Sequence, residues 1–168
     1  MTTSAVPSKP SVLNTTILSN FASIDRVDLL ASLAGICTVP VVQEELEDGV
    51  GEHPFLRPAV NAAGEEIPVG QISETVANRD AVVRGYLDPG ESQAFAVADV
   101  HDGRLLTDDG DARQFAKKQG VSVVGSVGVL LAAIDAEKID EATANDWLQT
   151  WIDEFGYRVP YRNIEDYR

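Results

Sequence analysis

Acidic side chains gather near the middle of the chain, in the stretch "RLLTDDGDARQFAKKQGV" that runs from residue 104 to 121. Asp108, Asp109 and Asp111 follow directly after a short apolar run. Carboxylates packed so closely repel one another unless a cation lies between them. Mg²⁺ and Mn²⁺ prefer all-oxygen ligands, so one interpretation of this stretch is a site for a hard divalent cation.

Other oxygen-bearing side chains also follow predicted strands or begin helices. The apolar "SVL" is followed by Asn14, "ICTV" by a helix that carries Glu44 and Glu45, and Glu91 opens the helix "GESQAFAVA". In parallel α/β folds, the working site lies at the carboxyl ends of the strands. We therefore expect Asn14, Glu45, Glu91 and Asp109 to lie around one cleft.

A structural role is the alternative for several of these residues. Acidic side chains are frequent in this chain, so any one of them can be a solvated surface charge. Asp111 can cap the helix "ARQFAKKQG", where a negative charge is favoured by the helix dipole, or it can contact a metal. Both interpretations of Asp111 are open at this stage.

Hydroxyl and cationic side chains flank the acidic stretch. Thr15 and Thr107 can position a phosphate or a water, or they can be ordinary cap and strand-end residues. Arg113 and Lys117 are four residues apart on one predicted helix face and are candidates for contacts to a phosphate backbone. The alternative for these two cations is ion pairing with the preceding aspartates.

Some classes of site are excluded or disfavoured. The chain has one cysteine, Cys37, and two histidines in loop-like stretches, so a zinc site is not expected. A single cysteine cannot form an internal disulfide, which fits a reducing cytoplasm. A small-molecule site in a doubly wound fold ranks last, because neither standard glycine-rich phosphate loop is present.

The charge of the chain is strongly negative, at −14, with 27 acidic and 13 basic residues. Such a charge normally disfavours nucleic-acid binding, which depends on cationic contacts to phosphate. Near molar salt, however, the Debye length falls to about 3 Å and surface repulsion is largely screened. We interpret the acidic surface as that of a halophilic source, an archaeon, in which the local site rather than the net charge determines the partner.

Apolar runs alternate with helical patterns along the chain. Strands are expected over 12–13, 36–39, 105–107 and 121–124, and helices between them. This alternation predicts an α/β fold, a three-layer α/β/α sandwich with a mainly parallel central sheet. We expect a disordered N-terminal lead over residues 1–10, a single domain over residues 11–168, and no membrane-spanning segment, because no apolar stretch is long enough.

Five segments in this order carry a resemblance to a known family: "VLNTTILSNF", "VPVVQEEL", "LDPGESQAFAVA", "LLTDDGDARQFAKKQGV" and "VVGSVGVLLAAI". The chain resembles the PIN-domain family of metal-dependent ribonucleases, which includes the toxins of many toxin–antitoxin pairs. It looks most similar to a poorly characterised, toxin-type branch of that family.

The resemblance implies a site and a function. The family binds Mg²⁺ or Mn²⁺ through four acidic residues, whose positions fall here on Asn14, Glu45, Glu91 and Asp109. The resemblance implies an endoribonuclease in which Glu45, Glu91 and Asp109 are catalytic, with RNA as substrate, an antitoxin as partner and a homodimeric state. Asn14 replaces the usual aspartate, so the alternative is a catalytically weakened PIN-like protein that binds RNA or a partner protein.

Overall fold

A computed structural model of the chain describes residues 3–168. Its centre is a parallel four-stranded sheet with the strand order β2-β1-β3-β4. The strands are β1 (Ser11–Leu13), β2 (Ile36–Cys37), β3 (Arg104–Leu106) and β4 (Ser122–Val124). Each lies where the sequence predicted a strand. Only β2 is clearly shorter, because Thr38 pairs with Val69 in an isolated bridge and Pro40 then begins a helix.

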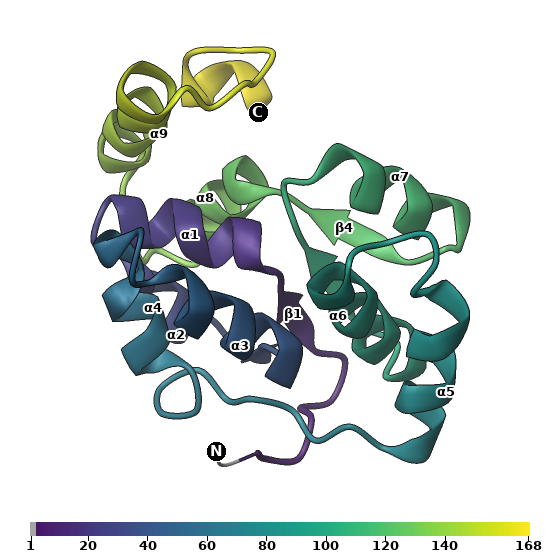
Figure 1. Cartoon of the computed structure of the whole chain (residues 1–168). Helices are drawn as coiled ribbons and strands as arrows, with labels where there is room; N and C mark the ends of the chain where they lie inside the picture. The colour runs from purple at the N-terminus through teal and green to yellow at the C-terminus, as the bar shows by residue number, and fades with distance from the viewer. Residues whose placement is uncertain (1–2) are drawn as a thin grey trace.

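Helices pack around the sheet: α6 lies against β1 and β3 and α7 against β4, and in Figure 1 α1 to α4 gather to the left of β1 and α5 to α7 to its right. The predicted α/β architecture is therefore confirmed. Their bounds are α1 (Thr15–Ser23), α2 (Val27–Ala31), α3 (Pro40–Gly49), α4 (Arg57–Ala62), α5 (Glu74–Val83), α6 (Pro89–Val100), α7 (Gly110–Lys118), α8 (Ser126–Asp135) and α9 (Glu141–Phe155), with the 3₁₀ turns η1 (Pro54–Leu56) and η2 (Ile164–Tyr167). In the part of the chain that the structure describes, no helix has the length and apolar character needed to cross a membrane.

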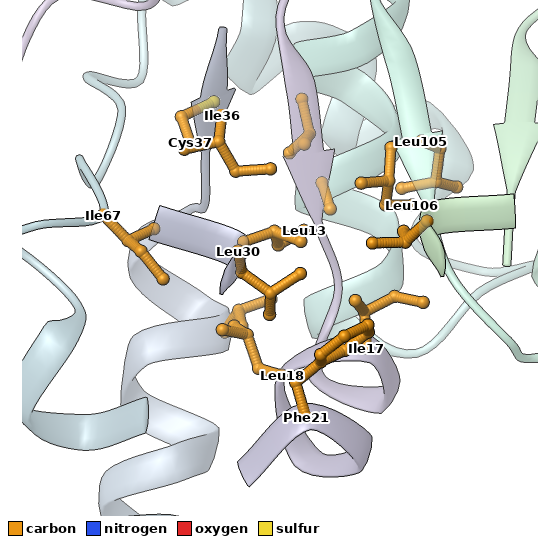
Figure 2. Packing of buried hydrophobic residues seen from close by; sticks show 14 of the residues in the cluster. Leu13, Ile17, Leu18, Phe21, Leu30, Ile36, Cys37, Ile67, Leu105 and Leu106 are labelled. Carbon is orange, nitrogen blue, oxygen red and sulfur yellow. The ribbon is translucent and has the colours of Figure 1, made fainter. Parts of the chain in front are cut away.

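The core forms where apolar residues of the strands meet the helices packed on them. In Figure 2, Ile17, Leu18 and Phe21 of α1 gather below Leu13 of β1 and near Leu106 of β3. The spacing of the three α1 residues places them on one helix face. On the other side, α6 is buried from Gly90 to Ala98, and its alanines allow close approach to β1 and β3.

The N-terminal segment contacts the rest of the domain through Ser4 and Val6. The backbone N–H of Ser4 donates to the carbonyl of Val69, and Ser4 accepts from the N–H of Gln71, both at 2.8 Å. Val6 packs against the core. These contacts tie Ser4 and Val6 to the domain, while residues 1–2 of the predicted lead lie outside the described part.

The apolar face of α9 belongs to the core. Leu148 and Trp151 are fully buried, and the indole N–H of Trp151 donates to the carbonyl of Asn20 at 2.8 Å. The ring of Trp151 also meets Phe21 edge-on, with centroids 5.0 Å apart. These two residues are therefore not available for a contact with a second copy of the chain.

Candidate functional site

Glu91 and Asp109 meet where α6 and α7 begin. Glu91 lies in the first turn of α6, and Asp109 is the N-cap of α7. Glu91 is buried, with 8% of its surface exposed, and its side chain lies within hydrogen-bonding reach of the Asp109 carboxyl. Burial, this hydrogen bond and the negative charges of Asp88 and Asp109 raise the pKa of Glu91 to about 8.

Asp88 is a member of this acidic group that the sequence analysis did not single out. Its Oδ1 accepts from the N–H of Glu91 at 2.9 Å, and the Glu91 carboxylate accepts in return from the N–H of Asp88 at 3.3 Å. This reciprocal pair is a capping box. The signal was present in "DPGE", because an aspartate followed three residues later by a glutamate is the pattern of that motif.

Glu45 approaches the same region from α3. The hydroxyl of Thr15 donates to Oε1 of Glu45 at 2.6 Å. Burial and the charge of Asp88 raise the pKa of Glu45, while the Thr15 hydroxyl and the N–H of Gly90 oppose that rise. A Cβ at Gly90 would collide with the Glu45 carboxylate, so this glycine leaves the space that the carboxylate occupies beside α6. Glu44 is exposed, so of the two adjacent glutamates Glu45 alone is directed to the site.

Asn14 is almost fully buried at the end of β1, with 2% of its surface exposed. Its Oδ1 accepts from the N–H of Thr15 at 2.8 Å and caps α1. Its amide donates to the hydroxyl oxygen of Thr107 at 3.0 Å, and that oxygen also accepts from the N–H of Asp109 at 3.1 Å. Thr107 therefore links Asn14 to Asp109 across β1 and β3.

Asp108 is turned into a separate hydrogen-bond network. Its carboxylate accepts from the backbone N–H and the hydroxyl of Ser126, from the amide of Asn20 at 2.8 Å and from the hydroxyl of Tyr157 at 2.8 Å. These donors come from α1, α8 and the segment after α9. They fix the loop from which the neighbouring Asp109 reaches Glu91.

The remaining predicted residues lie on α7. Asp109 is the N-cap of this helix, because Oδ2 of Asp109 accepts from the N–H of Ala112 at 3.1 Å. The interpretation of Asp111 as the cap is therefore wrong. Asp111 and Lys117 are exposed. Among the described residues, the ion pairs include no partner for Arg113 or Lys117.

A hollow of about 550 Å³ opens beside Asp109. Its lining includes several hydroxyl groups and an amide, and Arg158 supplies a cation. The lining includes Thr15, Thr16, Ser19, Asn20, Asp108 and Asp109. The hollow thus connects the Asp108 network with the edge of the acidic group.

The donor chemistry of the acidic group fits Mg²⁺ or Mn²⁺, because every side-chain donor is an oxygen. The pKa of Glu91 is raised first by burial and then by the neighbouring Asp109 and Asp88 carboxylates, whose repulsion a bound cation would relieve. Over residues 3–168, however, no three Asp, Glu, His or Cys side chains are already arranged to hold a metal ion. Glu45 instead contacts Thr15, and Asp109 contacts the first turn of α7.

A family model described as a PIN domain matches residues 10–167, nearly the whole chain. The chain belongs to the PIN-domain family. PIN domains have a nuclease-like fold and are generally divalent-metal-dependent ribonucleases. No curated protein matches the chain. The resemblance inferred from the five sequence segments is confirmed at the level of the family.

Proposed function

We propose that this PIN domain is a Mg²⁺- or Mn²⁺-dependent endoribonuclease. The observation that carries the proposal is the meeting of Glu91 and Asp109 at the starts of α6 and α7, with a pKa of about 8 at Glu91. Glu45 approaches the same helix start from α3, where it lies against Gly90. An acidic group with only oxygen donors, in a family of nuclease-like proteins, is best explained as a cation site that acts on phosphate.

The cation would be held by Glu45, Glu91 and Asp109, with Asn14 and Asp111 as the further ligands we propose. When bound, a divalent cation supplies charge stabilisation at the scissile phosphate and lowers the pKa of a coordinated water. The Thr15 hydroxyl orients the Glu45 carboxylate, and the Thr107 hydroxyl holds the N–H of Asp109. We assign Arg113 and Lys117 to contacts with the RNA backbone, as unpaired cations on the helix that Asp109 caps.

A cleavage assay tests this function. Single-stranded RNA is incubated with the purified protein in high KCl, with Mn²⁺, with Mg²⁺ or with EDTA. Cleavage is expected only with a divalent cation. Glu45→Gln is expected to reduce the rate at least a hundredfold. Glu44→Gln, which changes the exposed neighbour on the same helix, is the matched control and keeps the wild-type rate. Metal-independent cleavage, or none under any condition, contradicts the proposal.

Asn14 favours a second candidate, a catalytically weakened PIN domain that binds RNA or a protein. Both functional atoms of its amide already have partners, Thr15 for the oxygen and Thr107 for the nitrogen. An amide also places one negative charge fewer beside the cation than the aspartate usual in the family. Retention of RNA by a filter or gel-shift assay without any cleavage would support this candidate.

Finer parts of the proposal rest on the sequence resemblance and composition. We propose a toxin role with an antitoxin partner and a homodimeric state, which co-expression with a protein encoded beside this chain would test.

We propose a cytoplasmic location in a halophilic archaeon from the single cysteine and the net charge of −14. Because salt screens like-charge repulsion, the melting temperature should rise with KCl into the molar range. A melting temperature that falls with KCl contradicts this origin.

A further inference from the structure

Three aromatic rings contact one another in a column: Tyr86 before α6, Phe115 of α7 and Phe95 of α6. The ring of Tyr86 stacks on that of Phe115, with centroids 5.7 Å apart and planes inclined by 19°. Phe115 in turn meets Phe95 edge-on at 5.2 Å. Phe95 is fully buried, whereas Tyr86 is 74% exposed. The column therefore has a fixed base and one open aromatic face.

The column lies close to the acidic group along both helices. Phe95 follows Glu91 by four residues in α6, so the two share a helix face and are separated by about 6 Å along the axis. Phe115 lies on α7, which begins at Asp109. Tyr86 is two residues before Asp88, the cap of α6. The open ring therefore belongs to a residue two positions before the capping box that joins Asp88 to Glu91.

We propose that Tyr86 stacks an unpaired base of the RNA next to the nucleotide whose phosphate enters the acidic site. This inference rests on the proposed function. Single-stranded RNA presents unstacked bases, and an aromatic face binds any of them. Phe115 holds the Tyr86 ring in place, so little side-chain freedom is lost when a base stacks on it.

The surroundings fit a base better than a protein partner. The cations Lys117 and Lys118 lie exposed in the last turn of α7, and Lys118 follows Phe115 by three residues on the same face. They offer contacts to the RNA backbone beside the stacked base. The only other exposed large apolar side chain nearby in the described sequence is Val82, and two side chains fall far short of the roughly 800 Å² per partner of a stable protein interface.

The test measures binding separately from cleavage. A fluorescein-labelled single-stranded oligoribonucleotide is titrated in EDTA, where anisotropy gives Kd without turnover. Tyr86→Ala is expected to weaken binding about 5- to 100-fold, the range of one stacked base. Tyr86→Phe keeps the ring and should bind within about twofold of wild type. Phe55→Ala, which removes an exposed ring between α3 and α4, is the matched control and should bind like wild type.

Oligonucleotides with one abasic ribose at successive positions then locate the base. With the wild-type protein, an abasic ribose at one position should raise Kd by about as much as Tyr86→Ala does. With Tyr86→Ala, an abasic ribose at that position should raise Kd no further. Equal Kd values for wild type and Tyr86→Ala overturn the proposal. So does a loss of dimer in sedimentation without a change in RNA binding, which would assign Tyr86 to a second copy. Tyr86-dependent binding without any Mn²⁺-dependent cleavage leaves the stacking site standing and refutes the ribonuclease.

Discussion

The amide of Asn14 donates a hydrogen bond of 3.0 Å to the hydroxyl oxygen of Thr107, 93 residues later in the chain. This bond joins the ends of two neighbouring parallel strands, β1 and β3. Thr107 accepts the N–H of Asp109 with the same oxygen. The hydroxyl of Thr107 thereby connects Asn14 to Asp109, two of the residues that we propose as cation ligands.

Asn14→Asp should tighten binding of Mg²⁺ or Mn²⁺ about tenfold, equivalent to about 1.4 kcal/mol. The change adds one unit of negative charge beside the cation, and the gain is reduced by desolvation and by repulsion from the other carboxylates. The aspartate can still cap α1, and the Thr107 hydroxyl can turn to donate to it. Isothermal titration with Mn²⁺ measures the effect.

The gain depends on the other ligands, so Glu91→Gln in the Asn14→Asp background should remove it. RNA cleavage by Asn14→Asp should rise in parallel with affinity. If neither cation affinity nor cleavage changes, Asn14 does not contact the cation, and the weakened, non-catalytic candidate becomes the better account.

Gly90→Ala should weaken Mn²⁺ binding and slow cleavage, because the new methyl group collides with the Glu45 carboxylate and displaces it. Gly110→Ala is the matched control, since a Cβ there meets no atom within 4 Å at the start of α7. Mn²⁺ titration of both variants checks the prediction. Equal affinities in the two variants would show that the position of Glu45 does not matter for the cation.

Tyr157→Phe should lower the free energy of unfolding by about 1–3 kcal/mol, because it removes a hydrogen bond to a charged, partly buried carboxylate. Asp108→Asn should lower the free energy of unfolding further, since an amide cannot accept hydrogen bonds from all four donors of this network. Urea unfolding measures both. Tyr161→Phe, an exposed tyrosine, is the control and should unfold like wild type. The network has no stabilising role if Tyr157→Phe unfolds like this control.

The metal-free protein should lose stability as the pH rises from about 5 to 8. The pKa of Glu91 is about 8 in the folded chain and 4.5 ordinarily, so between these values the folded state binds a proton that the unfolded state has released. The free energy of unfolding then falls with rising pH. Urea unfolding in EDTA across this range should show the slope in the wild type and a flatter one in Glu91→Gln. Identical slopes in both proteins would contradict the raised pKa.

The strands and most helices could be predicted from the sequence because their apolar periodicity is regular. The expectation that Glu45, Glu91 and Asp109 lie around one cleft followed from parallel strands ending at one edge of the sheet. Those signals are local or topological, and they do not depend on the details of side-chain packing.

Other features could not be predicted because they depend on three-dimensional contacts. In "DDGDAR", the spacing allows either Asp109 or Asp111 to cap α7, and only the backbone geometry selects Asp109. The network of Asp108 requires Tyr157, which lies 49 residues away. The bridge between Ser4 and Gly70 is likewise marked by no sequence pattern.

A crystal of the protein grown with Mn²⁺ tests the central claim most directly, through the anomalous difference density of the metal. We predict one dominant peak bounded by the carboxylates of Glu45, Glu91 and Asp109, at the starts of α6 and α7. The same data decide whether Asn14 and Asp111 contact the cation. Absence of a peak at this position at millimolar Mn²⁺, or a dominant peak elsewhere on the surface, would contradict the assignment of this acidic group as the metal site of the protein.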